Sequence, residues 1–308
     1  MNGLIECIPN FSEGRDLNKI NRLVNIVKAH KSIMLLDYSY DYDHNRLVIT
    51  MAGGVNDIKD VMFDLIKEAS ILIDLNYHNG VHPRMGAVDV VPFVALDESL
   101  KDEAIKMSRT LAHDVADRLK IPTYLYEDSC ILEEHKNLQD LRKGEFEGLA
   151  KKQEDPKFSP DFGTGYHKSA GVCAIGVRKP LIAYNVVLDS SDLKLAKRIA
   201  KTIREASGGL PRLKAIGLML NSIGKVQVSM NLCDYHQTGI MDAFRIVRKL
   251  AKMENVDVLY SELIGLMPLE AIKTIDFEEI KLKDYDLDKQ VIEYRIKKIK
   301  EEKNEFWS

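Results

Sequence analysis

A short segment of the chain carries two histidines and an arginine. Residues 77–86 read YHNGVHPRMG, which places the imidazoles of His78 and His82 close to the guanidinium of Arg84. Histidine takes up and releases protons near neutral pH, and arginine binds carboxylates through paired hydrogen bonds. Two glycines and a proline restrict the path of the chain. The segment therefore predicts a fixed loop with acid–base and anion-binding groups, and Arg84 as a substrate-binding residue.

A metal site is one alternative for these histidines. His78 and His82 are four residues apart, a spacing that brings both rings to one side only on a helix. Gly80 and Pro83 disfavour a helix here, and no Glu completes an HExxH motif. Acid–base chemistry is favoured over metal binding, and no metal is expected. Two surface histidines without a chemical role remain the other interpretation.

Residues 6–15, ECIPNFSEGR, form a second candidate segment. A strand runs into a Pro-Asn turn, and the small residues Ser12 and Gly14 then open a predicted helix. Free N–H groups at a helix N-terminus favour anions, so a ligand carboxylate could lie here, near Asn10. The alternative is an ordinary capped helix with Ser12 or Asp16 as the cap.

Residues 37–46, DYSYDYDHNR, are crowded with acids and tyrosines between two predicted strands. The DxDxDG pattern of a calcium loop, with its distal Glu, is missing. A solvated connection is therefore expected for the acids. Arg46 differs, because an arginine at the entrance of a strand is well placed to bind a carboxylate.

Residues 161–171, DFGTGYHKSAG, form a glycine-rich segment. The phosphate-binding GxxxxGK[ST] motif is not met, and Lys168 stands where GxGxxG requires its third glycine. An aromatic-flanked loop near a domain junction still suits a flat ligand.

The elements that position these segments repeat an order of strand, helix, strand, strand, helix, strand in both halves. Apolar residues at helical spacing, such as Ile20, Leu23, Val24 and Val27, alternate with short apolar runs typical of strands. The predicted fold class is α/β (α+β), with two ferredoxin-like βαββαβ subdomains whose mixed sheets carry helices on one face. Their expected bounds are 1–179 and 180–308. The predicted strands are 4–9, 33–37, 47–51, 87–96, 181–188, 213–220, 226–232 and 256–264.

Two further regions lie outside this repeat. A helix over 98–120 and a strand over 123–126 are expected after the first half, followed by a charged linker or cover over 133–162. The tail, 284–303, carries Ile292, Ile296 and Ile299 at helical spacing. It predicts a terminal helix docked on the body of the protein.

Composition narrows the class of protein. A chain of 308 residues is long for one hydrophobic core, so two domains are expected. Forty-four basic and forty-seven acidic side chains give a net charge of −3, which disfavours a general nucleic-acid-binding protein. No signal peptide begins the chain, and no apolar run approaches the ~20 residues that span a bilayer. We expect a soluble cytoplasmic protein with reduced thiols and no CxxC pair, at Cys7, Cys130, Cys173 and Cys233.

Four segments in order resemble one known family. ECIPNFSEGR, HNGVHPRMGAVDVVPF, the DFG…G loop and SELIGLMPLEA are similar to the formiminotransferase half of formiminotransferase-cyclodeaminase. The resemblance implies two α/β subdomains around a folate groove, His82 as the catalytic acid–base, tetrahydrofolate as co-substrate and a homodimer. It also implies that the glycine-rich loop contacts folate, through Gly163, Thr164, Gly165, Tyr166, His167, Lys168, Ser169, Ala170 and Gly171.

Two departures from the family affect the site. The glycine-rich loop is one residue shorter than in the animal enzymes. Ser39 stands where animal members have an acid, two residues beyond the shared Asp37. If that acid orients the catalytic histidine, Asp41, Asp43 or another group must take over its role here.

The implied reaction moves a formimino group between glutamate and tetrahydrofolate, a step of histidine degradation. One imidazole can remove a proton from the attacking nitrogen and return one to the leaving nitrogen. Both substrates carry carboxylates, which Arg46, Arg84, Lys168, Arg178 and Arg212 are candidates to bind. Formyl transfer to or from 5-formyltetrahydrofolate, a glycine acceptor and folate binding without turnover remain the alternatives.

Overall fold

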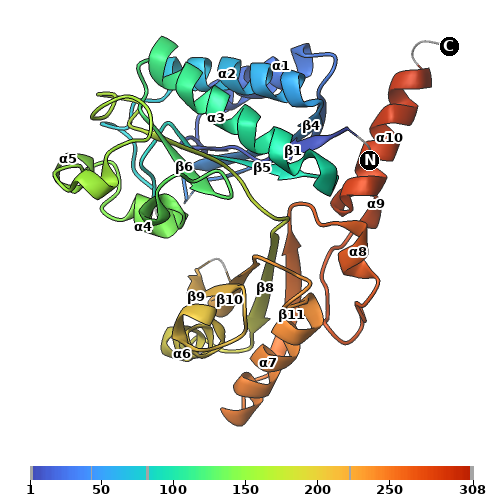
Figure 1. Ribbon diagram of the computed structural model, residues 1–308. Helices are drawn as coiled ribbons and strands as arrows, with labels where there is room; N and C mark the ends of the chain where they lie inside the picture. Colours follow the sequence, from blue (N-terminus) through green and yellow to red (C-terminus); the bar gives the residue numbers. More distant parts are fainter. Residues whose placement is uncertain (1–2, 43, 81–82, 222, 306–308) are drawn as a thin grey trace. The chain divides into compact units, whose positions relative to one another are not determined.

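A computed structural model describes residues 3–42, 44–80, 83–221 and 223–305. The chain divides into two compact units, Met1–Arg178 and Lys179–Ser308. Each unit has its own sheet and its own hydrophobic core. They are described separately below and are drawn in Figure 1.

The first unit is built on one mixed sheet. β1 and β2 form an interrupted strand, broken at Ile8-Pro9, that pairs on one side with β4 and on the other with β5. β3 pairs with β4, and β7 lies between β5 and β6 with parallel pairing to both. The strands are β1 (Ile5–Cys7), β2 (Asn10–Phe11), β3 (Met34–Asp41), β4 (Arg46–Gly53), β5 (Val88–Ala95), β6 (Thr123–Glu127) and β7 (Cys173–Val177).

Three helices cover one face of this sheet. Their apolar stripes, including Leu23, Leu65 and Leu111, are buried in one core with the strands, and each such side chain contributes roughly 1.5–3 kcal/mol. Figure 1 shows the three helices side by side above the sheet. They are α1 (Leu17–Ala29), α2 (Val55–Leu72) and α3 (Lys101–Arg118), the last preceded by η1 (Glu98–Leu100).

The opposite face of the sheet has a cover of its own. Tyr124, Tyr126 and Val90 pack there with Leu141 and Leu149 in a smaller core. The charged segment after β6 is thus a cover. The prediction of helices on one face of the sheet is incomplete for this unit, because the other face is covered as well. Parallel strands such as β5, β7 and β6 bury both of their faces. The cover contains η2 (Glu133–His135), α4 (Leu138–Arg142), α5 (Leu149–Lys152) and η3 (Pro156–Phe158).

Two strands differ from the sequence prediction. β7 was not expected, because its CAIGV run is too short to show a period and follows directly on the glycine-rich loop. β3 continues to Asp41, so the connection predicted over 37–46 is much shorter. Tyr38 and Tyr40 favour extended structure and sit on an edge strand, where their side chains stay exposed.

The second unit confirms a ferredoxin-like arrangement. Its four described strands pair antiparallel in the order β11-β8-β10-β9, and α6 and α7 share a core with them. The elements follow one another as β8 (Ile182–Leu188), α6 (Leu193–Ile203), η4 (Glu205–Ser207), β9 (Leu213–Leu220), β10 (Lys225–Leu232), α7 (Ile240–Met253) and β11 (Val258–Ile264).

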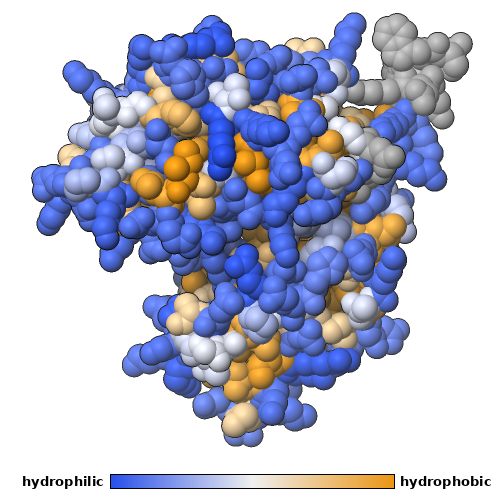
Figure 2. Space-filling model, in the orientation of Figure 1, coloured by the Kyte–Doolittle hydropathy of each residue, from blue (hydrophilic) through white to orange (hydrophobic). Residues whose placement is uncertain are grey.

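Three helices end the chain: α8 (Leu269–Ile272), α9 (Leu287–Gln290) and α10 (Ile292–Glu305). Ile292, Ile296 and Ile299 of α10 are buried, as their spacing predicted. Within the described ranges, no helix is both long and apolar enough to cross a membrane. Figure 2 shows mostly hydrophilic side chains on the face that it presents, with smaller hydrophobic patches between them.

Candidate functional site

The structure joins the two most distinctive segments of the sequence. Residues 83–87, at the entrance to β5, run antiparallel to the end of the glycine-rich loop through a bridge between Gly86 and Gly171. The amide of Ala87 donates to Ala170 O at 2.9 Å, and that of Val172 donates to Met85 O at 3.0 Å. His82, the predicted acid–base residue, lies outside the described residues, but the chain that follows it is held against the glycine-rich loop.

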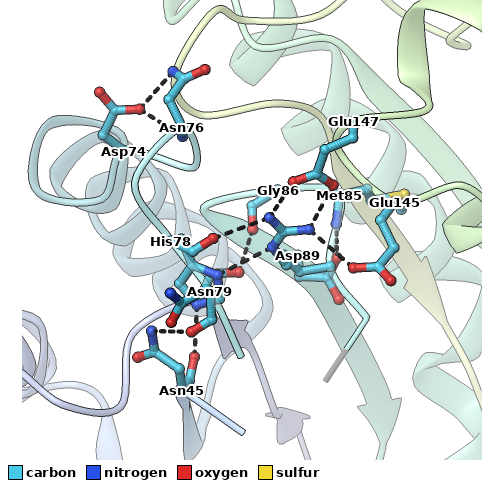
Figure 3. Close-up of polar contacts among 12 residues, drawn as sticks. Asn45, Asp74, Asn76, His78, Asn79, Met85, Gly86, Asp89, Glu145 and Glu147 are labelled. Atoms are coloured by element: carbon cyan, nitrogen blue, oxygen red, sulfur yellow. Dashed lines mark hydrogen bonds and ion pairs between the residues drawn. The ribbon is translucent and has the colours of Figure 1, made fainter. Parts of the chain in front are cut away.

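The preceding end of the histidine segment is tied to the same loop. The amide of Leu75 donates to Ser169 O at 2.8 Å, and the side-chain amide of Asn76 donates to Lys168 O at 2.9 Å. Asp74 in turn accepts from Asn76, as Figure 3 shows. The loop therefore contacts the chain both before and after His82.

Arg84 is buried and its guanidinium is fully engaged. Glu147 accepts two hydrogen bonds from it, at 2.6 and 2.8 Å, and Glu145 accepts one at 3.0 Å. Figure 3 shows Glu145 and Glu147 on the right and His78 on the left of this group of contacts. The hydrogen bond from Arg84 lowers the pKa of Glu147, and that same bond raises the pKa of Arg84. The guanidinium of Arg84, which was predicted to bind a substrate carboxylate, thus binds two carboxylates of the cover segment.

His78 is held in one protonation state. Arg84 Nε donates to its Nδ1 at 3.1 Å, and its Nε2 lies 3.0 Å from the carbonyl oxygen of Asn45. Because a guanidinium can only donate and a carbonyl can only accept, Nδ1 is unprotonated and Nε2 carries the hydrogen. Burial lowers the pKa of His78, and the nearby charge of Arg84 lowers it further. The contacts of His78 thus fit a neutral residue that holds the segment in place.

Asn45 connects three segments around the site. Its Oδ1 accepts from Gly14 N at 2.8 Å, and its Nδ2 donates to Asn79 O at 3.0 Å. Its backbone carbonyl oxygen accepts from Nε2 of His78. Its backbone has φ +50°, a conformation that asparagine tolerates better than most residues. Its side chain, placed in Figure 3 below His78 and Asn79, fixes the start of the histidine segment.

A small cavity of about 10 Å³, room for one water molecule at most, adjoins this segment. It brings together three predicted substrate-binding residues, Asn10, Arg46 and Arg84, although they come from separate parts of the chain. Burial and the neighbouring positive charge of Arg142 lower the pKa of Arg46. The lining residues are Asn10, Phe11, Ser12, His44, Asn45, Arg46, His78, Arg84 and Asp89.

Asp89 and Arg142 are members of this region that sequence reasoning missed. The carboxylate of Asp89, on β5, is buried and lies 2.5 Å from an Arg142 terminal nitrogen. Its other oxygen accepts from Met85 N at 2.8 Å. An Asp among the apolar residues of a predicted strand, AVDVVPF, was the available signal. Arg142 gave no such signal in the sequence, because it belongs to a charged segment whose apolar residues do not recur at a regular spacing.

The glycine-rich loop has a defined path. Gly163, Gly165 and Gly171 adopt φ between +65° and +80°. His167 and Gly171 exchange backbone hydrogen bonds, and His167 Nδ1 accepts from Ala170 N at 3.0 Å, which closes a tight turn. Near its start the loop borders a surface cavity of about 540 Å³, lined by His113, Ala116, Asp117, Lys120, Pro122, Asp161, Phe162, Gly163 and Thr164.

The segment ECIPNFSEGR leads into an ordinary capped helix, which confirms the alternative with Asp16 as the cap. α1 begins only at Leu17, and Asp16 is its cap, accepting from Asn18 N at 2.9 Å. Ser12 is buried and donates to Gly86 O at 2.8 Å. The segment thus holds the entrance of β5 instead of presenting a free helix N-terminus to an anion.

Other predicted residues lie elsewhere. Arg178 follows β7, whose opposite end, at Cys173, adjoins the glycine-rich loop, and it does not line the small cavity. Arg212 belongs to the second unit. The carboxylate of Asp41 accepts from His44 N at 2.6 Å. No group of three His, Cys, Asp or Glu side chains suited to a metal ion occurs in the part of the chain that the structure describes.

Comparison with known proteins gives matches over both units. A model of the formiminotransferase domain, N-terminal subdomain, matches residues 4–178, and a model of the formiminotransferase domain matches residues 183–299. A glutamate formimidoyltransferase of Streptococcus pyogenes serotype M1 is 41% identical over 94% of this chain and 97% of its own length. One of Thermoplasma acidophilum is 37% identical over 92% and 94%. A formimidoyltransferase-cyclodeaminase of Dictyostelium discoideum is 39% identical, and the match covers 88% of this chain and 52% of that protein.

Proposed function

The chain belongs to the formiminotransferase domain family, and from this premise we propose how it works as a one-carbon transferase. It moves a formimino group between N-formimino-L-glutamate and tetrahydrofolate. His82 is the general acid and base, and the glycine-rich loop binds the folate. The observation that carries this assignment is the bridge between Gly86 and Gly171, which places the loop beside the chain that follows His82.

The reaction needs two proton transfers at one place. N5 of tetrahydrofolate attacks the amidine carbon of formiminoglutamate and loses its proton, and a tetrahedral intermediate forms. The bond from that carbon to the glutamate nitrogen then breaks as this nitrogen gains a proton. One imidazole can accept the first proton and donate the second, an effect typically worth ~10²–10⁴-fold in rate.

His82 is the better candidate of the two histidines because of what holds His78. The Nδ1 lone pair of His78 accepts from Arg84, and its Nε2 hydrogen is directed at Asn45 O. A ring with both nitrogens committed cannot shuttle protons without breaking these bonds. The same contacts hold the start of the segment in place.

Tetrahydrofolate is the co-substrate, and residues 163–171 are its proposed contacts. The fixed turn of His167–Gly171 and the exposed residues Gly163 and Thr164 offer hydrogen-bonding groups to a flat, polar ring system. Asn10, Arg46 and Arg84 are the proposed partners for the formiminoglutamate carboxylates, since they come together at one place beside the histidine segment. Arg178 stays a proposed substrate-binding residue on the strength of the resemblance alone.

The remaining assignments concern the protein as a whole. Residues 1–179 form the proposed catalytic subdomain and residues 180–308 the second subdomain. The four cysteines are free, in keeping with a cytoplasmic location. We propose a homodimer, as the family resemblance implies. Light scattering on the purified protein, read against the mass of 35.0 kDa for one chain, tests this.

One assay tests the reaction and its cargo. The purified protein is incubated with tetrahydrofolate and one of three donors: formiminoglutamate, formylglutamate or formiminoglycine. The folate product is followed by absorbance. Turnover with formiminoglutamate above the other two is expected. Preference for formylglutamate or formiminoglycine would contradict the proposed cargo or acceptor, and folate binding without turnover on any donor would contradict an enzyme.

A further inference from the structure

A buried histidine outside the small cavity is paired with a carboxylate. His135 is fully buried, and its Nδ1 lies 2.8 Å from Asp161 Oδ2. The side chain of Asp161 is only 3% exposed. Burying two such groups is costly unless each is paired and hydrogen-bonded, so the pair needs an explanation.

The two ring contacts of His135 restrict where its protons can lie. Its Nε2 lies 2.9 Å from the carbonyl oxygen of Lys157, which can only accept. Its Nδ1 faces Asp161 Oδ2, which already accepts from the amide of Leu125 at 2.8 Å. Both ring nitrogens therefore face acceptors, and an imidazolium beside a carboxylate satisfies every partner.

This pair ties the origin of the glycine-rich loop to the edge of the sheet. β6 is an edge strand, and its outward amides are covered by other segments. Thr123 N donates to Phe162 O at 3.0 Å, Leu125 N to Asp161 Oδ2, and Glu127 N to Lys136 O at 3.1 Å. His135 binds the two covering segments to each other directly before Gly163.

A second set of contacts extends from the same place into the loop. Tyr124 packs edge-to-face against the ring of His135, with 5.1 Å between centroids. Its hydroxyl donates to Phe158 O at 2.6 Å and accepts from Gln153 at 3.0 Å. Gln153 also donates to Gly165 O at 3.0 Å. The backbone of the loop is thus held by hydrogen bonds from Gln153, which Tyr124 connects to the ring of His135.

We propose that His135 and Asp161 form a buried imidazolium–carboxylate pair that positions residues 163–171 for tetrahydrofolate. His135 is then a positioning residue for the reaction, acting through Asp161 and the loop. The part of this inference that concerns folate rests on the proposed function. The part that concerns the protonation state rests on the contacts alone.

Nitrogen-15 NMR of the unaltered protein tests the pair without any substrate. Assignment by comparison with His135→Gln identifies the ring signals of His135. Two protonated nitrogens at neutral pH are expected. One unprotonated nitrogen would overturn the imidazolium–carboxylate pair.

Variants test the positioning role. His135→Gln can donate to only one of the two acceptors. Asp161→Asn keeps an oxygen that can accept from both Leu125 N and His135, but it removes the negative charge that stabilises an imidazolium. His30→Gln is the matched control, because it removes a His–Asp contact of 3.2 Å at the surface. Misplacement of the loop should raise the KM and the Kd for tetrahydrofolate by about tenfold to a hundredfold. The KM for formiminoglutamate should change less than about twofold.

The readouts separate two kinds of failure. If the unaltered protein binds no tetrahydrofolate, the proposed function is wrong and the role of the pair for folate is overturned with it, whereas the NMR result still decides the pair. If the unaltered protein binds folate but both His135→Gln and Asp161→Asn keep the KM and Kd of the control variant, His135 has no positioning role. A parallel rise in both KM values would show a general loss of structure and would also overturn it.

Discussion

Gly86 and Gly171 face each other across an antiparallel bridge in which neither position has room for a side chain. A Cβ on Gly86 would lie well under 3.0 Å from the carbonyl oxygen of Val172. One on Gly171 would meet Met85 O in the same way. Because both obstacles are backbone atoms, they cannot move aside as a flexible side chain would. The close approach of the histidine segment and the glycine-rich loop depends on these two glycines.

Gly171→Ala should destabilise the protein. The added Cβ combines a left-handed backbone, φ +67°, with a backbone clash. Gly165→Ala is the control, because Gly165 has φ +65° and no atom within 4 Å of the added Cβ. The control should lose about 1–2 kcal/mol of unfolding free energy, and Gly171→Ala about 1–3 kcal/mol more. Urea unfolding measures both, and equal losses would mean that the bridge opens without cost.

His82→Ala should lower kcat by about 10²–10⁴-fold while tetrahydrofolate still binds. The reason is that the ring carries protons in the reaction and is not needed to hold the folate. Steady-state kinetics and a folate binding titration measure the two quantities. Near-normal turnover of this variant would remove His82 from the mechanism.

His78 predicts a pH dependence of stability. Its pKa in the folded protein is lowered from 6.5, mainly by burial, so the unfolded chain binds more protons in the window just below that value. The stability that neutral His78 contributes is therefore present above pH 6.5 and is lost as the pH falls towards the folded-state pKa. His78→Gln can keep both hydrogen bonds without titrating. The difference in urea midpoint between the unaltered protein and this variant should change between pH 7 and pH 5, and a constant difference would contradict the prediction.

Glu147→Gln tests what the guanidinium of Arg84 does during turnover. Glu147 accepts two hydrogen bonds from the guanidinium, whereas Glu145 accepts one. If a substrate carboxylate replaces Glu147, weakening this contact should lower the KM for formiminoglutamate, by about twofold to tenfold for a hydrogen bond to a charged group. Glu145→Gln should lower it less. A KM that rises in Glu147→Gln would instead mean that Arg84 serves to hold the cover segment in place.

Periodicity predicted most of the fold because it reports on local burial. The helices around Leu23, Leu65 and Phe244 follow apolar stripes, and the alternation at 226–232 matches β10. β7 escaped, since five apolar residues between a glycine-rich loop and a proline have no period to detect. The cover itself was predicted, but its short helices α4 and α5 were not, because only a few of its residues, such as Leu141 and Leu149, are buried.

The sequence by itself determined the chemistry that this protein can offer: a histidine loop, a glycine-rich loop and arginines near the starts of strands. Residue types and the order of motifs are local properties, so they can be read without a fold. Only the tertiary structure decided which groups meet. It joined Gly86 to Gly171, set Glu147 on Arg84, fixed the tautomer of His78 and paired His135 with Asp161. Such contacts link segments far apart in the chain, and strand pairing and the packing of the cover bring them together.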